Sequence, residues 1–307
     1  MPCKKIKKIF KKFLLPENIA FERLLLYNYG KYTKILEVFM KVRYGFFPGN
    51  KRKALTMSYD DGVVQDRRLV EIFNKYGIKG SFHLNSASLG KERHIDASEV
   101  ATLYAGHEVS VHTLTHPFLE RVPAMEVVRE VIEDRKNLEE LCGYLVRGMS
   151  YPFGTYSAQL MDQLKDLGIV CSRTTKSTDR FNIPENFLEW HPTCHHRENI
   201  MAKLERFKND RYGMRLFYVW GHAYELDQEI ENNNWQMIED FCAAASNDPE
   251  VWYATNIEIY DYVTAMRSVV LSADCTMAYN PSAIDVILEV DGEPVTVPAG
   301  KTVKLSK

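Results

Sequence analysis

From residue 51 onward the sequence predicts an α/β barrel, because short apolar runs of strand length alternate with longer amphipathic runs of helix length. The expected strands cover residues 54–59, 79–84, 108–111, 145–150, 169–172, 215–220 and 251–254. Seven strands that alternate with helices favour closure into a barrel. The expected helices cover residues 64–76, 123–141, 157–167, 234–245 and 256–269, with a short helix opening at 96–99. Residues 173–198, rich in His, Pro and Asn, are expected to form a long loop.

Length and composition limit the class of protein. A chain of 307 residues with 45% hydrophobic and 26% charged residues buries a full core, as one large domain with appendages. The net charge of -2 gives no general attraction to nucleic acid. No apolar run reaches the roughly 18 residues of a membrane helix. The six cysteines form no C-x-x-C pair, which favours reduced thiols and a reducing compartment.

Both ends of the sequence depart from the barrel pattern. Lysines and apolar residues interleave at helical spacing over residues 4–14, and a helical pattern continues over 20–47 to Pro48-Gly49. Residues 1–50 are therefore expected to be a basic amphipathic helical extension. Residues 286–290 and 295–297 flank Asp291-Gly292, which is typical of a hairpin. The predicted domains are this extension, the barrel over 51–270 and a small β appendage over 271–307.

The basic extension has two interpretations. Its segment 4–14 has the pattern of a helix that lies on an anionic membrane surface, and also of an arm that packs on its own protein or a partner. The lysines interrupt any apolar core of a secretory signal, so no cleavage is predicted. We expect a cytoplasmic protein, peripheral to the inner membrane face in the first interpretation.

Charged and imidazole side chains follow several of the predicted strands. Asp60-Asp61-Gly62 ends the first strand, the pair His112 and His116 follows the third, and His222 follows the sixth. Two histidines four residues apart can share one metal, and a carboxylate completes a set that leaves positions open for water. The non-functional alternatives are a plain turn at Asp60-Asp61-Gly62 and histidines that lie on the surface or pack in the core.

Three ordered motifs give a specific resemblance. Ser58-Tyr-Asp-Asp-Gly62, Gly106-His-Glu-Val109 leading into His112-Thr-Leu-Thr-His-Pro117, and Tyr151-Pro-Phe-Gly154 resemble the polysaccharide deacetylases, carbohydrate esterases with the NodB-homology domain. The resemblance spans about residues 52–265 and implies a distorted seven-stranded (β/α) barrel. It does not extend to the N-terminal arm or the hairpin.

The resemblance also implies roles for individual residues. Asp60 is the implied catalytic base, and Asp61, His112 and His116 are the implied ligands of one divalent metal, zinc first and Co, Mn or Ni as alternatives. The backbone N–H of Phe153 is the implied oxyanion donor, and His222 the implied general acid. Glu225, three residues after His222, is a candidate to orient that imidazole.

One family feature is missing. Many members carry an arginine two residues before the motif proline, where it orients the base, and this sequence has Ser150 there. Arg147 and Arg173 are candidates to replace it, and Arg173 is favoured because it directly follows its predicted strand. An exposed or ion-paired arginine is the alternative for both.

Other residues are weaker candidates. Tyr151, Pro152, Trp190 and Trp220 are expected to line the substrate site, with the tryptophans stacking on sugar rings, although they also fit a core role. Trp190 opens the run Trp190-His-Pro-Thr-Cys-His-His196, whose spacing fits no standard zinc pattern, so a structural or substrate-lining role is favoured over a second metal. His83 and His107 are interpreted as packed or surface histidines.

The sequence thus indicates a metal-dependent hydrolase that removes N-acetyl groups from an amino-sugar glycan or a glycolipid precursor. Hydrolysis of another non-peptide amide, such as an N-formyl sugar or a cyclic amide, is an alternative. A catalytically silent glycan-binding or membrane-associated module on the same barrel is a second alternative, which the serine at position 150 keeps open.

Overall fold

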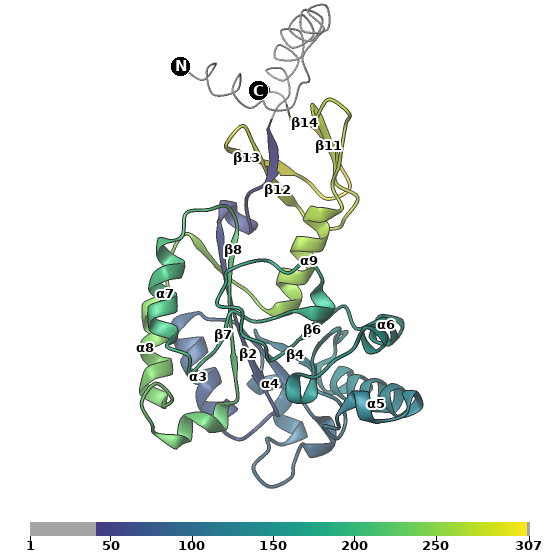
Figure 1. Cartoon of the computed structure of the whole chain (residues 1–307), viewed down its shortest axis with the longest axis vertical. Coiled ribbons are helices and arrows are strands. Elements are labelled where there is room, and N and C mark those ends of the chain that lie inside the picture. The colour runs from purple at the N-terminus through teal and green to yellow at the C-terminus, as the bar shows by residue number, and fades with distance from the viewer. Residues whose placement is uncertain (1–40, 306–307) are drawn as a thin grey trace, which may run out of the picture.

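The computed structural model describes residues 41–305, and these residues form a curled parallel sheet with helices outside it and two small sheets at one end (Figure 1). The predictions for residues 1–40, including the membrane contact of residues 4–14, lie outside the described residues.

The main sheet is built around β2 (Lys53–Asp60), which has parallel partners on both sides. The order is β6-β5-β4-β3-β2-β8-β7, and β9 pairs with the first half of β2. These strands are β3 (Gly80–Leu84), β4 (Glu108–Val111), β5 (Gly148–Ser150), β6 (Cys171–Arg173), β7 (Cys194–His195), β8 (Arg215–Gly221) and β9 (Val251–Tyr253). The predicted distorted (β/α) barrel is confirmed, and its strands match the seven expected runs with one addition, β7.

That addition corrects the expected long loop at 173–198. Trp190 N–H donates to Ser172 O (3.1 Å) beside β6, and Thr193 N–H and His196 N–H donate to Tyr218 O and Trp220 O of β8 (both 2.8 Å). The segment 190–196 therefore links the two edges of the curled sheet and closes it. A paired stretch this short has no periodic pattern, so the sequence gives no strand signal there.

Helices cover the outside of the sheet. They are α3 (Asp66–Tyr76), α4 (Val100–Leu103), α5 (Ala124–Cys142), α6 (Ala158–Asp166), α7 (Ile200–Asn209), α8 (Trp235–Ala245) and α9 (Asn256–Arg267). Short 3-10 turns occur at Pro48–Asn50, Ser86–Ser88, Ala97–Glu99, Leu119–Arg121, Pro152–Gly154, Phe187–Glu189 and Ala223–Gln228. Figure 1 shows α3, α7 and α8 along one side of the sheet and α5 and α6 along the other. Of the longer helices, α7 was not predicted from the sequence.

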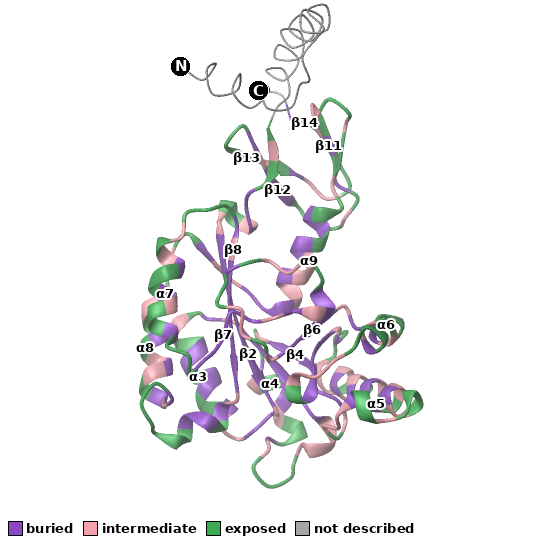
Figure 2. Ribbon diagram, viewed as in Figure 1, coloured by how far each residue is buried: buried purple, intermediate pink, exposed green. Residues whose placement is uncertain are grey.

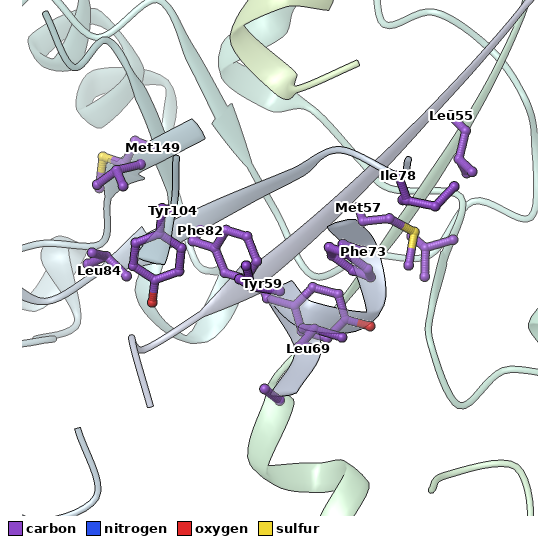
Figure 3. Packing of buried hydrophobic residues seen from close by; sticks show 14 of the residues in the cluster. Leu55, Met57, Tyr59, Leu69, Phe73, Ile78, Phe82, Leu84, Tyr104 and Met149 are labelled. Atoms are coloured by element: carbon purple, nitrogen blue, oxygen red, sulfur yellow. The ribbon is translucent and has the colours of Figure 1, made fainter. Parts of the chain in front are cut away.

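The two faces of β2 explain how the core is divided. Leu55, Met57 and Tyr59 alternate toward one face, where Tyr59 meets Phe73 of α3 at a ring distance of 5.9 Å (Figure 3). Each such fully buried side chain contributes about 1.5–3 kcal/mol. The intervening Ser58 and Asp60 are equally buried but point the other way, into the barrel. The barrel interior is therefore polar at the end where β2 stops. Figure 2 shows that the strands of the main sheet are largely buried.

Trp190 belongs to the apolar core, which corrects its predicted contact with substrate. Its side chain is 1% exposed and packs edge-to-face against Phe187 (4.8 Å) and Tyr218 (4.9 Å). A ring with no accessible face cannot stack on a sugar. Its bulk instead supports the segment that closes the barrel.

Two three-stranded sheets lie at the end of the barrel where β2 begins. One joins β1 (Val42–Tyr44) to the hairpin β12 (Val286–Val290) and β13 (Glu293–Val297), so the hairpin forms as predicted. The other contains β10 (Val270–Leu271), β11 (Met277–Tyr279) and β14 (Thr302–Lys304). Residues 42–44 form a strand where a helix was expected, because pairing with β12 outweighs the local helical pattern. The division at residues 50 and 270 stays a prediction.

Two further findings concern membrane spans and cysteines. Within residues 41–305, no helix combines the length and apolar character needed to cross a membrane. The five cysteines of the described region, all except Cys3, are unpaired thiols.

The burial of Trp190 leads to a stability prediction. Trp190→Ala is expected to lower the free energy of unfolding by about 3–5 kcal/mol, because it leaves a cavity under the closing segment. Chemical denaturation measures the change. The control is Tyr212→Ala, an aromatic that is 79% exposed, for which we expect a change within about 0.5 kcal/mol. Equal free energies of unfolding for the two variants would contradict the core role of Trp190 and favour the substrate-lining role expected from the sequence.

Candidate active site

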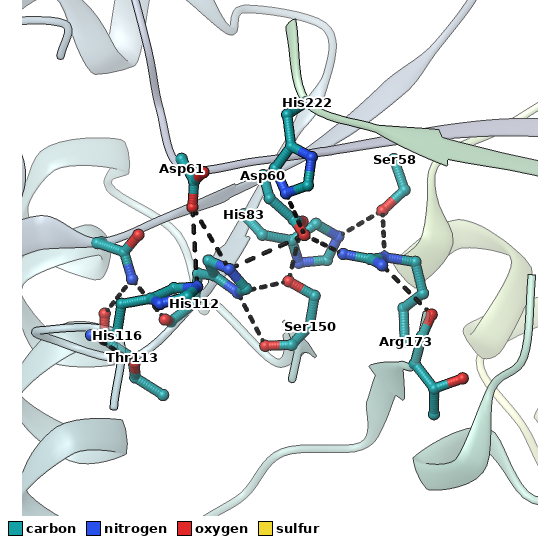
Figure 4. A network of polar contacts seen from close by, with 12 residues as sticks. Ser58, Asp60, Asp61, His83, His112, Thr113, His116, Ser150, Arg173 and His222 are labelled. Atoms are coloured by element: carbon teal, nitrogen blue, oxygen red, sulfur yellow. Dashed lines mark hydrogen bonds and ion pairs between the residues drawn. The ribbon is translucent and has the colours of Figure 1, made fainter. Parts of the chain in front are cut away.

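The carboxyl ends of the parallel strands bring the predicted site residues together (Figure 4). Asp60 ends β2, His112 directly follows β4, Arg173 ends β6 and His222 directly follows β8. Parallel strands deliver the residues at their ends to one face of a barrel, which explains why positions so far apart in the sequence meet.

Asp61, His112 and His116 form a group with the geometry of a metal site. Asp61 Oδ1 lies 3.6 Å from His112 Nε2 and 3.9 Å from His116 Nε2. Neighbouring ligand atoms of a tetrahedral ion with bonds of about 2.0–2.2 Å are separated by about 3.4 Å. Both distances from Asp61 exceed this separation by no more than a few tenths of an ångström, so these residues fit a zinc-like ion.

Ser150 sets the orientation of His112. His112 Nδ1 donates to the Ser150 carbonyl oxygen (3.0 Å) and also lies 2.7 Å from Ser150 Oγ. A proton on Nδ1 leaves the lone pair of Nε2 facing Asp61, which is the tautomer that binds a metal. Ser150 Oγ in turn donates to Asp60 Oδ1 (3.0 Å). The residue that departs from the family pattern therefore contacts both the candidate ligand and the candidate base.

The backbone around this group is strained. Asp61, Thr113, His116 and Phe153 have φ of 80°, 68°, 64° and 60°, in the left-handed region that residues with a Cβ rarely adopt. Each such residue costs of order 1–3 kcal/mol and persists only when its surroundings fix it. Strained residues of this kind are common at functional sites, so their position around Asp61 supports this end of the barrel as the candidate active site.

Residues missed by the sequence analysis hold the loop that carries the histidines. Asp134 Oδ2 accepts from His112 N–H (3.1 Å), and Glu130 accepts from the backbone and hydroxyl of Thr115 (2.8 and 2.7 Å). Asn85 Nδ2 donates to Thr113 O (2.9 Å). Glu130 and Asp134 are four residues apart on the buried face of α5. The sequence signal that could have revealed them is the position of two acidic residues on the apolar face of a helix, where a buried role is expected.

Asp60 is a buried carboxylate kept ionised by its neighbours. Arg173 Nη2 pairs with Asp60 Oδ2, and His112 Nε2 lies 3.8 Å from the same oxygen. Burial alone raises the pKa of Asp60, but the positive charge of Arg173, followed by His112, His83 and His222, holds it far below the usual range of an aspartate. Asp60 is therefore an anion that accepts protons.

Arg173, the favoured replacement for the missing arginine, reaches the predicted base. Its Nε donates to Ser58 Oγ (3.1 Å), and its guanidinium lies 4.4 Å from the centre of the Trp220 ring. Arg147 instead makes an outer ion pair with Asp261 (2.7 and 3.0 Å). His83 Nε2 lies 2.8 Å from Ser58 Oγ, and burial lowers the pKa of His83 to about 3, so it is a neutral core histidine.

The imidazole of His222 lies close to both Asp60 and Glu225. Its Nε2 lies 4.0 Å from Asp60 Oδ2, and its Nδ1 lies 3.6 Å from Glu225 Oε1. Burial lowers the pKa of His222, but Glu225, Asp60 and Asp61 together raise it above the ordinary histidine value. The position thus favours a protonated imidazole beside the site.

The predicted substrate-lining residues are more deeply buried than expected. Tyr151 is 1% exposed and Pro152 is buried, so neither offers a surface to a ligand, and that prediction is corrected. Trp220 is 8% exposed, with Arg173 over its ring. Phe153 is an exposed aromatic at the site, 49% accessible, and its ring stacks on Phe118 at 3.7 Å beside His116. Phe118 had no signal in the sequence.

A second histidine group lies behind His222. His195 Nε2 and His196 Nε2 are 2.9 and 3.3 Å from Glu225 Oε2. Direct hydrogen bonds explain these distances, whereas the wider spacing around Asp61 leaves room for an ion. The expected structural role for the His-rich run agrees with this packing.

Fold and site together define a class, the α/β barrels with a candidate metal site at the carboxyl ends of their strands. Residues 48–172 match the family model described as "Polysaccharide deacetylase". Over this segment the chain matches the family that the motifs predicted.

Individual relatives agree with this assignment. The chain is similar to the peptidoglycan-N-acetylglucosamine deacetylase PgdA of Listeria monocytogenes, with 26% identity over 38% of this chain and 24% of the relative. It is also similar to the peptidoglycan-N-acetylmuramic acid deacetylase PdaC of Bacillus subtilis, with 22% identity over 37% of this chain and 24% of the relative. The match thus spans about a quarter of these curated relatives. A solved Mycobacterium smegmatis structure bearing the polysaccharide deacetylase description shares the fold, with a TM-score of 0.56, 15% identity, and coverage of 74% of this chain and 96% of that one.

The buried ion pair gives a prediction that does not depend on activity. In protein treated with a chelator, Arg173→Ala is expected to cost about 3–5 kcal/mol of stability at neutral pH, because it leaves Asp60 charged and unpaired. The folded pKa of Asp60 is depressed, so the pair contributes above the unfolded pKa of about 4 and its contribution is lost as pH falls below it. The cost should therefore shrink in acid, as denaturation at several pH values will measure.

Arg147→Ala is the matched control for this experiment. Arg147 and Asp261 are each 32% exposed, so the change should stay below about 1 kcal/mol. Equal costs for the two arginines would contradict the assignment of Arg173 as the essential partner of Asp60.

Proposed function

We propose that this protein is a metal-dependent hydrolase that removes N-acetyl groups from an amino-sugar glycan or glycan precursor and releases acetate. One observation carries the proposal. A candidate ligand group, Asp61 with His112 and His116, lies beside a separate buried anion, Asp60, with the imidazole of His222 on the far side. This is the set of groups that water activation and amine protonation require.

Asp61 Oδ1 and the Nε2 atoms of His112 and His116 would hold the ion. Zinc suits a site of two imidazoles and one carboxylate, and Co, Mn or Ni are the alternatives. When bound, a divalent ion supplies a Lewis acid that polarises a carbonyl oxygen and lowers the pKa of water.

The chain's own residues supply the proton transfers. Asp60 accepts the proton of the attacking water, because Arg173 and Ser150 fix its carboxylate in place. The backbone N–H of Phe153 donates to the oxygen that becomes negative when the acyl carbon turns tetrahedral. His222 Nε2 donates a proton to the nitrogen as the C–N bond breaks. A free amine and acetate result.

The relatives support the substrate class. PgdA and PdaC are described by their names as acting on N-acetylglucosamine and N-acetylmuramic acid of peptidoglycan. Since this chain matches about a quarter of each, the sugar polymer is part of the proposal. A cytoplasmic location, with residues 4–14 on an anionic membrane surface and a glycolipid precursor as substrate, is proposed from the sequence alone.

The alternatives from the sequence carry different expectations. A catalytically silent module was favoured by Ser150, and the contact of Arg173 with Asp60 weakens that argument because it supplies the missing cation. Hydrolysis of another amide uses the same residues and differs in the acid released.

One set of variants should lose both bound metal and acetate release, and another should lose acetate release while it keeps the metal. Asp61→Ala and His112→Ala are expected to lose both, whereas Asp60→Asn should keep the metal and lose roughly 10²–10⁴-fold in kcat. Metal analysis of zinc-supplemented protein and an acetate assay on chito-oligosaccharides measure these effects. Asp162→Ala, an exposed carboxylate on α6, is the control with unchanged values.

Three outcomes would contradict the proposal. Acetate release that survives Asp61→Ala would remove the metal site from the reaction. Formate in place of acetate in a substrate panel would indicate the other amide. Protein that binds no divalent ion and releases no acid would be the silent module.

The raised pKa of His222 predicts the alkaline side of the pH profile. The proton donor is present below this pKa and lost above it, so kcat should fall as pH rises through a value higher than that of an ordinary histidine. Glu225→Gln removes one of the charges that raise this pKa and should shift the fall toward lower pH. An unshifted profile would show that another group limits the rate.

A further inference from the structure

The second histidine group contains three residues that the proposed reaction does not use directly. His195 and His196 lie on and just after β7, and Glu225 lies in the 3-10 turn Ala223–Gln228 that follows His222. All three are buried, with exposures of 5%, 0% and 7%. Buried ionisable groups are unfavourable unless they are paired, so their arrangement needs an explanation.

The proton on His195 is placed by the backbone. Arg197 N–H donates to His195 Nδ1 (3.4 Å), so Nδ1 is an acceptor and the proton of the neutral ring is on Nε2. His195 Nε2 then donates to Glu225 Oε2 at 2.9 Å.

The proton on His196 is placed by Asn233. The amide nitrogen of Asn233 donates to Glu225 O (3.0 Å) and Gln228 Oε1 (3.2 Å), so its Oδ1 is the acceptor facing His196 Nε2 at 2.9 Å. The Tyr59 hydroxyl lies 3.2 Å from His196 Nδ1 and donates to it. His196 Nε2 is therefore a donor, shared between Asn233 and Glu225 Oε2 (3.3 Å).

Glu225 is the acceptor at the centre of the group. Burial raises its pKa, but the hydrogen bond from His195 and the nearby imidazole of His222, followed by the charges of both rings, lower it well below the usual range of a glutamate. The carboxylate is thus an anion with Oε2 occupied by the two imidazoles. Its Oε1 faces His222 Nδ1 at 3.6 Å, and this buried nitrogen has no hydrogen-bond partner within the described residues.

We infer that His195 and His196 are positioning residues, which fix the Glu225 carboxylate as the acceptor for Nδ1–H of His222 so that Nε2 carries the proton donated to the leaving amine. The inference rests on the proposed function. In this step the His222 Nε2–H bond breaks, the leaving nitrogen gains the proton as its bond to the acyl carbon breaks, and neutral His222 keeps its proton on Nδ1. Without Glu225 in place, either tautomer would be equally available and the ring could rotate.

The packing around the group supports a fixed arrangement. A Cβ at Gly221 would lie 2.1 Å from His196 Nδ1, so a glycine before His222 is required by the approach of the His196 ring. His195 also packs edge-to-face on Trp220 at 4.6 Å. The charged or titratable groups that face His222 are Asp60, Asp61, Tyr224, Glu225 and His195.

Two substitutions of His195 distinguish a hydrogen-bond donor from a metal ligand. His195→Gln keeps a donor near the position of Nε2, whereas His195→Leu removes it. We expect the leucine variant to lose about 10–100-fold in kcat with little change in KM. The glutamine variant should stay close to the unaltered protein. His107→Gln, a half-buried histidine before β4 at the other end of the barrel, is the control with unchanged kcat.

A second measurement does not need activity. In ¹⁵N-labelled protein at a pH where His222 is neutral, the imidazole nitrogens of His222, assigned by comparison with His222→Gln, should show the proton on Nδ1. Glu225→Gln and His195→Leu should populate the Nε2–H tautomer, and His195→Gln should not. If His195→Leu fails to fold, Glu225→Gln gives the result alone.

Two results would overturn the inference. One is that His195→Leu leaves both kcat and the His222 tautomer unaltered. If His195→Leu does not fold, the same result for Glu225→Gln would overturn the inference. The other is a second zinc ion per chain that is lost in both His195 variants, since this would make the group a metal site. If the unaltered protein releases no acetate, the proposed function fails, and the nitrogen spectra still decide whether the positioning network exists.

Discussion

The ion pair between Asp60 and Arg173 is the constraint on which the rest of the site depends. A carboxylate at the end of a central strand, 3% exposed, is unstable unless a cation accompanies it into the barrel. Arg173 comes from the edge strand β6, and its guanidinium is held between Ser58 and the ring of Trp220. The sheet must therefore close far enough to bring β6 across the barrel from β8, which the segment 190–196 accomplishes.

The same logic extends to the candidate ligands. Four non-glycine residues with left-handed backbone cannot hold their conformation by themselves, and buried carboxylates on α5 fix the loop that carries His112 and His116. Ser150 then links the candidate ligand His112 to the candidate base Asp60 by one hydroxyl. The candidate base, ligands and acid thus follow different strands but share supporting residues, and these residues are buried more deeply than the exposed ring of Phe153 beside them.

The sequence was sufficient for the features that have a local pattern. Long strands such as β2 and β8 are clear apolar runs of strand length, and the ordered motifs identified the strand ends where Asp60, His112 and His222 meet. Arg173 was found because the family arginine is missing at Ser150 and Arg173 directly follows its predicted strand. The sequence was not sufficient where partners distant in the chain decide the outcome. β7 is too short to show a period, β1 is a strand only because β12 pairs with it, and Tyr151 and Trp190 are aromatics whose burial depends on the closed barrel.

The pairing of β1 with β12 has a consequence for how the chain folds. Lys41 and Asp291, at one end of this ladder, are hydrogen-bonded across 250 residues. A contact of such sequence separation closes a very long loop and forms late. During synthesis, the edge of β1 has no partner until β12 has emerged, while the barrel strands between them can already pair. The small sheet of β1, β12 and β13 is therefore expected to form last. A chain that ends before β12 would leave the edge of β1 unpaired and exposed.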